Sequence, residues 1–149
     1  MNVIELDNPE ISDFQILVDL MFQQMSDIGS SKERSSVESA ARNALKSESR
    51  TRFFLAKNDE VAIGAAFINI CSGIESGGDY VWVNEIQISP DFRKQGLGKK
   101  LLDHILRWAK HNNYKFVMGV ADQENTSSQA LFESRGFSVE DTKWMIKRV

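Results

Sequence analysis

The 149-residue chain is poor in cysteine, histidine and proline. Its one cysteine, Cys71, has no partner for an internal disulfide. One cysteine and two histidines are also too few for the common zinc sites, so we expect no metal. Only two prolines, with 42% hydrophobic and 26% charged residues, are typical of a folded globular chain and exclude a disordered or collagen-like one.

Excess positive charge and long apolar runs are missing as well. The net charge is −3, so the chain lacks the overall basic charge of many nucleic-acid-binding proteins, and we expect no nucleic-acid partner. The longest apolar run, residues 61–70, is interrupted by Gly64 and Asn69 and is far shorter than the ~20 residues of a membrane span. The opening "MNVIELDNPE" lacks the regions of a secretory signal. These absences predict a cytoplasmic protein without a membrane partner.

The first half of the chain alternates between helical and strand-like patterns. No repeat, linker or low-complexity tract divides the sequence, so residues 1–149 are expected to form one domain. Apolar spacing predicts a strand at 3–6, a helix at 9–25, a loop at 26–36 and a helix from Ser36 to about residue 47. A hairpin follows at 52–70 and turns at 57–60, and the glycine-rich segment 71–79 is predicted to be a flexible loop.

The second half alternates strand and helix regularly. Strands are predicted at 80–88 and 115–120 and helices at 96–111 and 126–135, and the tail 137–149 is predicted to form one or two strands. The sequence Thr126-Ser-Ser-Gln129 is a capping pattern at the start of the last helix. Gly136 suits the position just after that helix, with Phe137 packing back on Phe132. The β-α-β-α-β order predicts an α/β fold.

The segment "ISPDFRKQGLGKK", residues 88–100, puts two glycines and four basic side chains between a strand and a helix. It lacks the spacing of a nucleotide P-loop, and Leu101 stands where a dinucleotide fingerprint needs its third glycine. The arrangement Arg93-x-x-Gly96-x-Gly98 remains. Glycines expose consecutive backbone N–H groups, and a helix N-terminus adds roughly half a positive charge, so this turn favours a pyrophosphate ligand.

Three segments together resemble the GNAT superfamily of N-acetyltransferases: "IQISPDFRKQGLGKKLL", then "VADQEN", then "ALFESRGF". The likeness covers residues 80–137, whereas residues 1–79 agree only in the order of their elements. It implies the GNAT fold, a twisted mixed β-sheet with helices on both faces and a cofactor cleft between two splayed central parallel strands. It also implies transfer of an acetyl group from acetyl-CoA to an amine by direct attack.

The resemblance assigns cofactor-binding roles to residues on both sides of the cleft. The main-chain N–H groups from Gln95 to Lys99 would hold the pyrophosphate, and Arg93 would add charge or pair with a carboxylate. Asn125 would contact the cofactor arm or merely cap a helix. The Ile88 N–H is the candidate donor that polarises the thioester carbonyl. The full cofactor-binding set comprises Ile86, Ile88, Arg93, Lys94, Gln95, Gly96, Leu97, Gly98, Lys99, Asn125, Ser128 and Phe132.

The acceptor side of the site needs a proton acceptor, because an amine with a pKa near ~10 is mostly ammonium at neutral pH. Glu85 is the candidate base, although it would equally orient the substrate or pair with a lysine. The candidate acceptor-binding residues are Tyr80, Trp82, Asn84 and Asp122, with Glu124 beside the last. A small-molecule amine is the expected acceptor, and a peptide or protein amine is the second interpretation.

Phe132 departs from the family pattern, in which many relatives have a tyrosine that is proposed to protonate the leaving thiolate. Phenylalanine has no proton to donate, so water or another hydroxyl, such as that of Ser128, would replace it. The departure also keeps a second interpretation open, a non-catalytic acyl-CoA-binding sensor or scaffold. His104 and His111 are predicted to have structural roles. Many members of the family dimerise, so a homodimer stays open as well.

Overall fold

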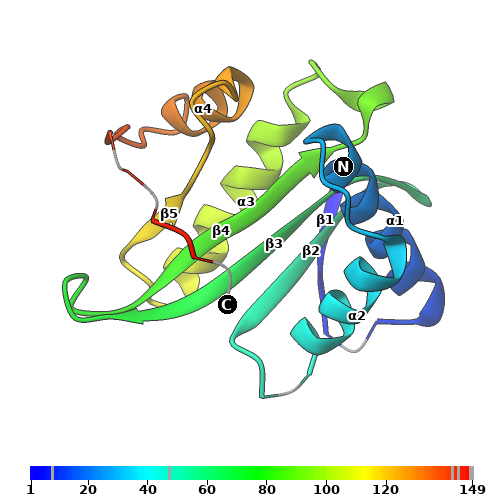
Figure 1. Ribbon diagram of the computed structural model, residues 1–149, viewed down its shortest axis with the longest axis horizontal. Coiled ribbons are helices and arrows are strands. Elements are labelled where there is room, and N and C mark those ends of the chain that lie inside the picture. Colours follow the sequence, from blue (N-terminus) through cyan, green and yellow to red (C-terminus); the bar gives the residue numbers. More distant parts are fainter. Residues whose placement is uncertain (8, 47, 142, 144, 148–149) are drawn as a thin grey trace.

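The structure, a computed structural model, describes residues 1–7, 9–46, 48–141, 143 and 145–147. In this part of the chain five strands form one mixed sheet in the order β1-β2-β3-β4-β5 (Figure 1). Neighbouring strands are antiparallel except β4 and β5, which are parallel. The strands are β1 (Asn2–Leu6), β2 (Thr51–Asn58), β3 (Val61–Gly73), β4 (Gly78–Ile88) and β5 (Val117–Gly119).

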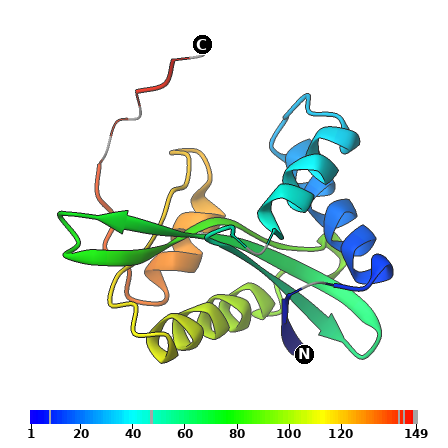
Figure 2. The same ribbon diagram turned by 90° about the horizontal axis from the view of Figure 1, so that it is seen from below.

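Helices cover both faces of the sheet, as the sequence predicts. The helices α1 (Ile11–Asp27) and α2 (Arg34–Ala44) lie on one face, and α3 (Leu97–His111) and α4 (Thr126–Glu133) lie on the other (Figure 2). A short 3₁₀ helix, η1 (Pro90–Phe92), connects β4 to the turn before α3. Among the described residues, no helix combines the length and the apolar composition needed to span a bilayer.

Each face of the sheet has its own apolar core because successive strand residues point to opposite sides. On β2, Phe53 and Leu55 pack with α1 and α2, whereas Phe54 and Ala56 pack with α3. The long helix α3 contributes three fully buried side chains, which are Leu101, Leu102 and Ile105. The two cores hold β3 and β4 between layers of helix, which makes these strands the rigid centre of the molecule.

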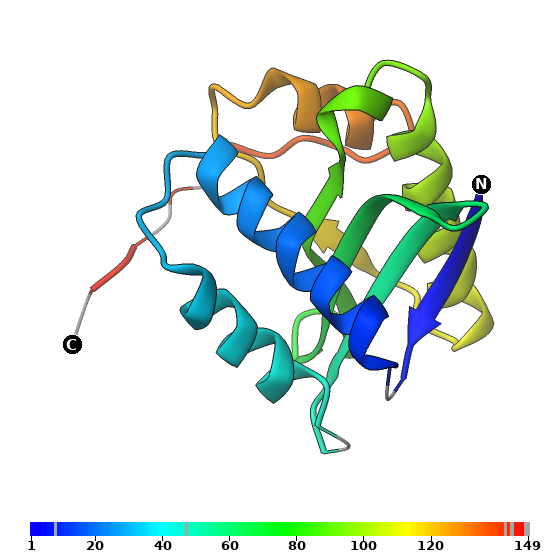
Figure 3. The ribbon, with the colours of Figure 1, turned by 90° about the vertical axis from the view of Figure 1, so that its right-hand side faces the viewer.

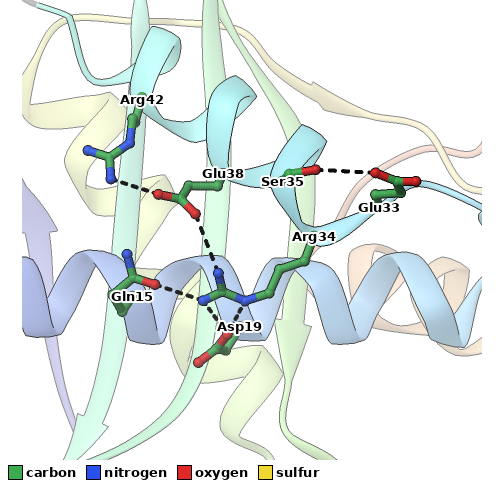
Figure 4. A network of polar contacts seen from close by, with 7 residues as sticks. All are labelled: Gln15, Asp19, Glu33, Arg34, Ser35, Glu38 and Arg42. Atoms are coloured by element: carbon green, nitrogen blue, oxygen red, sulfur yellow. Dashed lines mark hydrogen bonds and ion pairs between the residues drawn. The ribbon is translucent and has the colours of Figure 1, made fainter.

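Polar contacts fix α2 against α1, and the two helices lie side by side in front of the sheet (Figure 3). Arg34 is the centre of this network (Figure 4). Its Nε lies 2.8 Å from an oxygen of Asp19, and one Nη lies 2.8 Å from Gln15 Oε1. Arg42 donates to Glu38 over 2.7 Å, and that hydrogen bond lowers the pKa of the Glu38 carboxyl. The α1–α2 unit is therefore held as one piece over the sheet.

A β-bulge interrupts the pairing of β4 with β3. Phe67 pairs with Glu85 and Ile68 pairs with Val83, so Asn84 is an extra residue on β4. In a regular strand, Val83 and Glu85 would share a face because they are two residues apart. The bulge separates them: Val83 lies in the core beneath α3, and Glu85 faces α1.

The segment 71–79 is a hairpin and not the flexible loop that its glycines predict. β3 continues through Gly73 and β4 begins at Gly78, with Cys71 paired to Tyr80. Gly77 has φ +71° and Gly78 has φ +146°, so these glycines supply the backbone conformations of a tight turn. Glycine-rich composition alone did not distinguish a turn from a loop.

One helix start and one helix cap differ from the prediction. The helix expected from Ser36 begins at Arg34, and the Ser36 amide already donates to the Glu33 carbonyl over 3.0 Å. Its expected end, residue 47, lies outside the described residues. The last helix is capped by Asn125 and not by Thr126, because the Asn125 side chain accepts a hydrogen bond from the Ser128 amide. An amide oxygen one residue earlier in the chain was in reach of the first free N–H groups.

The end of α4 confirms the predicted glycine cap. Gly136 has φ +80° and donates its N–H to the Glu133 carbonyl over 2.9 Å. The Phe137 amide donates to the Phe132 carbonyl over 3.3 Å, which completes a Schellman motif. The rings of Phe132 and Phe137 meet edge to face at 4.9 Å between centroids.

The predicted strands in the tail are wrong for the described residues 137–141, 143 and 145–147, none of which is in a strand. This segment leads away from the sheet (Figure 2), and Val139, Met145 and Ile146 are exposed. Alternating side chains show which face of a strand would be buried, but a strand also needs a backbone partner. Positions 142, 144 and 148–149 of the predicted strands lie outside the described residues.

Candidate active site

The candidate site begins where β4 and β5 stop pairing. β5 is shorter than the predicted 115–120 and pairs only with residues 81–83 of β4. The last pair, Val83 with Gly119, lies directly before the bulge at Asn84. β4 then continues to Ile88 beyond the end of β5 (Figure 1). The edge of β4 after the bulge therefore faces a gap, which is defined here as the space beside residues 84–88 where β5 has ended.

Two backbone N–H groups of β4 point into this gap. The Ser89 amide donates to the Ile63 carbonyl over 2.9 Å, which makes these two residues a hydrogen-bonded pair. Pairs alternate along an antiparallel ladder, so Ile88, which lies opposite Gly64, directs its N–H away from β3. The same alternation directs the N–H of Ile86 into the gap. Both isoleucine side chains pack in the core beneath α3.

Gly64 allows β3 and β4 to approach closely at this point. A Cβ added there would lie 2.5 Å from the Gln87 carbonyl oxygen and 2.6 Å from Ile88 Cδ1. Both distances are shorter than real Cβ contacts, so any larger residue would displace β4. The glycine thus fixes the position of the Ile88 peptide at the rim of the gap.

The glycine turn presents further N–H groups at the start of α3. Gly96 has φ +73° and is the N-cap residue of α3, with no side chain capping it. The Lys100 amide makes the bond to the Gly96 carbonyl at 3.2 Å, and the amides of residues 97–99 precede it. Lys94 and Lys99 are exposed beside them, and a Cβ at Gly96 would meet nothing within 4 Å. Uncapped amides, a helix N-terminus and nearby lysines fit an anionic ligand.

Arg93 ties the turn to the protein in this structure. Its Nε donates to the Ile88 carbonyl over 2.8 Å, and one Nη donates to Asp27 Oδ2 over 2.6 Å. The guanidinium lowers the pKa of the Asp27 carboxyl by hydrogen bonding to it. Of the two roles that the sequence left open for Arg93, the structure shows pairing with a carboxylate, which lies 66 residues earlier in the chain.

Asn125 combines a structural contact with an unused donor. Its Oδ1 accepts hydrogen bonds from the Ser128 amide and the Ser127 hydroxyl, both at 3.1 Å. These bonds fix the orientation of the amide. In the described part of the chain its Nδ2 has no hydrogen-bond partner, so this group remains available at the start of α4.

Phe132 packs directly on the end of β5. A Cβ on Gly119 would lie 2.8 Å from Phe132 Cζ and 2.9 Å from Cε1, so the ring occupies the space that a side chain at 119 would need. This contact and the Phe137 ring hold α4 against the end of β5. The ring carries no proton donor, so the structure supplies no acid at the position where the family pattern has tyrosine.

Glu85 lies on the other side of β4, beneath α1. Its Oε2 accepts a hydrogen bond from Gln24 Nε2, and burial raises the pKa of its carboxyl from 4.5 to about 7. A second glutamine–α1 contact lies nearby, where Gln87 Nε2 donates to the Leu20 carbonyl. The carboxyl is therefore held in a fixed place and changes charge near neutral pH.

Sequence reasoning did not identify Gln24, although one signal was present. The apolar stripe of α1 includes Phe14, Leu17 and Met21, and Gln24 continues this spacing with a polar residue. A polar side chain at a core-facing position needs a partner inside the protein. That partner is Glu85, 61 residues further along the chain.

The structure brings together only some of the predicted acceptor-binding residues. Trp82 lies between two residues that face α3 and therefore points to the same face as Glu85. Asn84 is exposed on the bulge, where its Nδ2 donates to Asn69 Oδ1 over 2.9 Å. Tyr80 lies towards the hairpin turn and meets the Phe116 ring at 5.8 Å. Its burial raises the pKa of its hydroxyl.

Asp122 lies in the exposed loop before α4. Its backbone carbonyl accepts a hydrogen bond from the Asn125 amide over 2.9 Å and another from Gln129 Nε2 over 2.9 Å. In the described part of the chain, no hydrogen bond or ion pair links its carboxylate to β4. Trp82, Asn84 and Glu85 therefore form one group on β4, and Tyr80 and Asp122 lie outside it.

Comparison with known proteins connects this geometry to one family. The sequence model of the acetyltransferase (GNAT) family matches residues 16–137. The aminoglycoside N(6′)-acetyltransferase type 1 of Salmonella typhimurium strain LT2 is 32% identical over 96 residues. That match covers 62% of this chain and 65% of the relative, so the chain matches less than two thirds of that protein's length.

Solved structures agree on the fold. A probable acetyltransferase superposes with a TM-score of 0.87 at 17% identity, covering 100% of this chain and 99% of that one. An aminoglycoside N-acetyltransferase in complex with CoA superposes with a TM-score of 0.81 at 21% identity, covering 99% and 95%. Both confirm the predicted GNAT fold, and together with the match over residues 16–137 they lead to one conclusion. The chain belongs to the acetyltransferase (GNAT) family.

Proposed function

We propose that this protein is an N-acetyltransferase that moves the acetyl group of acetyl-CoA to a primary amine of a small molecule. One observation carries the proposal: a single strand, β4, directs backbone N–H groups into the gap along its edge and places a partly buried carboxyl, Glu85, on the face beneath α1. Similarity to an aminoglycoside acetyltransferase and the net charge of −3 favour a cationic acceptor of the aminoglycoside or polyamine type.

The residues at the gap fit coenzyme A. The amides of residues 97–99 and the lysines Lys94 and Lys99 would hold the pyrophosphate at the start of α3. The N–H groups of Ile86 and Ile88 would pair with the extended pantetheine arm as a strand pairs with its neighbour. Asn125 Nδ2 would add one hydrogen bond from the far side. When bound, acetyl-CoA supplies an activated acetyl thioester.

Glu85 removes a proton from the acceptor. An alkyl ammonium with a pKa near ~10 cannot attack a carbonyl until it loses a proton. With a carboxyl pKa of about 7, Glu85 is largely ionised at slightly alkaline pH and still binds the proton that it receives. An unperturbed glutamate would be a weaker base, so burial tunes this residue for the task.

The Ile88 N–H would assist by donating a hydrogen bond to the thioester carbonyl at the rim of the gap. Its direction is set by the ladder and by Gly64 and needs no rearrangement. Phe132 cannot donate a proton, so this chain contributes no acid there. A thiol has a pKa near ~8.5, so coenzyme A could leave as the thiolate without a general acid.

The test is release of free thiol from acetyl-CoA with a panel of aminoglycosides, polyamines, amino acids and basic peptides. We expect turnover with at least one class of small-molecule amine and loss of most of it at neutral pH in Glu85→Gln. Turnover with peptides alone would show that the acceptor is a peptide or protein amine and not a small molecule.

Phe132 favours one alternative, a non-catalytic acyl-CoA-binding sensor or scaffold. That function predicts tight CoA binding by calorimetry and no thiol release with any amine. Tight binding together with turnover would exclude it.

A further inference from the structure

We propose that Gln24 is a positioning residue for Glu85, holding the carboxylate in its proton-accepting orientation. This inference rests on the proposed function, in which Glu85 accepts the proton of the amine. Gln24 lies in the last part of α1, and its Nε2 donates to Glu85 Oε2. The bond therefore joins α1 to β4, the strand that borders the gap.

The other half of the Gln24 amide lacks a partner among the described residues, so the side chain is poorly satisfied at this position. Gln24 Oε1 is buried and has no hydrogen-bond partner in the described part of the structure. A buried acceptor without a partner destabilises the fold relative to an apolar side chain of the same shape. Within the described ranges, the hydrogen bond that this side chain does make is the one from Nε2 to Glu85. A residue that weakens local packing and contacts one candidate base is typical of a functional position.

The surroundings of Glu85 leave Gln24 as its polar support. On β3, Phe67 lies opposite Glu85, and on β4 the neighbouring Asn84 and Gln87 are uncharged. Asp27 near the end of α1 and Arg93 in the turn before α3 are paired with each other. Burial is accordingly the cause of the raised pKa of Glu85. A donor to the carboxylate opposes that effect, because it stabilises the charged form.

Loss of the donor therefore has a defined direction. In Gln24→Met, a side chain of similar length without polar atoms, the Glu85 carboxylate loses its hydrogen bond and becomes harder to form. Hydrogen bonds to charged groups correspond to a pKa change of about one to two units. We expect the Glu85 pKa to rise by that amount, and kcat/KM at pH ~6 to fall about ten-fold or more while recovering above pH ~9.

The experiment measures the Glu85 carboxyl directly by ¹³C NMR titration in the wild type, Gln24→Met and Gln15→Met, and measures kcat/KM against pH in parallel. Gln15 is the matched control, a glutamine of the same helix that accepts a hydrogen bond from Arg34 and is remote from Glu85. A double variant with Glu85→Gln completes a cycle, in which Gln24→Met should have no further effect if it acts through Glu85.

The outcomes separate this inference from the proposed function. A higher Glu85 pKa in Gln24→Met, with unchanged or greater thermal stability at pH ~5, where the folded protein keeps Glu85 protonated, and no change in Gln15→Met, supports the positioning role. An unchanged pKa, or an activity loss of equal size at every pH, overturns it. If the wild type shows no turnover, the proposed function fails, and the NMR titration still decides whether Gln24 controls Glu85.

Discussion

Replacing Glu85 by glutamine should stabilise the folded protein at alkaline pH. The folded pKa of about 7 lies above the ordinary value of 4.5, so the native state holds the proton more tightly than the unfolded chain does. Below pH ~4.5 both states are protonated and the difference vanishes. As the pH rises through the window between the two values, the unfolded state ionises first and the native state loses stability. Above pH ~7 the loss is complete.

The size of the effect follows from the separation of the two pKa values. Each pH unit corresponds to about 1.4 kcal/mol, so ionising Glu85 inside the fold costs about 3 kcal/mol relative to the unfolded chain. Glutamine has the same shape and its Oε1 accepts the hydrogen bond from Gln24, so Glu85→Gln should remove this cost and keep the contact. For a chain of this length, the gain corresponds to a rise in Tm of roughly 6–12 °C.

The assay is urea unfolding of the wild type and Glu85→Gln at pH ~5 and pH ~8.5, where linkage predicts a small and a large difference respectively. An exposed carboxyl supplies the control: Glu60→Gln in the β2–β3 turn removes the same charge at a site without the partial burial of Glu85. A Glu85→Gln variant that is no more stable than the wild type at pH ~8.5 would refute the reasoning. So would a gain of equal size at both pH values.

Three further predictions test the gap and its surroundings. Gly119→Ala places a Cβ 2.8 Å from Phe132 Cζ and should lower the free energy of unfolding by about 1–3 kcal/mol, with Phe132→Leu restoring part of it in denaturant titrations. Asn125→Ala should lower the stability by about 1 kcal/mol through loss of the α4 cap, whereas Asn125→Asp should keep the cap and weaken CoA binding in calorimetry because it lacks the amide donor. Gly96→Ala, at φ +73°, should weaken CoA binding more than Gly98→Ala, whose added Cβ meets only ordinary contacts; equal losses would contradict a backbone explanation.

Sequence patterns predicted the elements that local periodicity determines. The helix beginning near Gly96, the hairpin from 52 to 70 and the Gly136 cap all depend on residues within a few positions of one another. The family segments then placed β4, the glycine turn and β5 in the right order, because those segments are contiguous with the elements that they describe.

The features that sequence did not predict depend on distant partners. The contact of Gln24 with Glu85 joins residues 61 apart, and nothing near either residue marks the other. The Asn125 cap is local, and the sequence left both Asn125 and Thr126 open as caps; the structure selects Asn125 because its side chain reaches the Ser128 amide. Alternation in the tail gave no information on whether a neighbouring strand edge was in reach.

The extra residue at Asn84 has opposite effects on two features of β4: it ends the pairing with β5 and it opens the gap. A bulge disrupts the ladder and bends the strand, and β5 pairs no further than the residue before it. Deleting one codon there would leave Glu85 and Ile86 on their present faces, because simple alternation from Val83 places them identically. The shortened strand would have a regular edge on which β5 could continue to pair. Such a deletion would therefore close the gap and complete the sheet, so one extra residue in β4 is enough to keep the gap open.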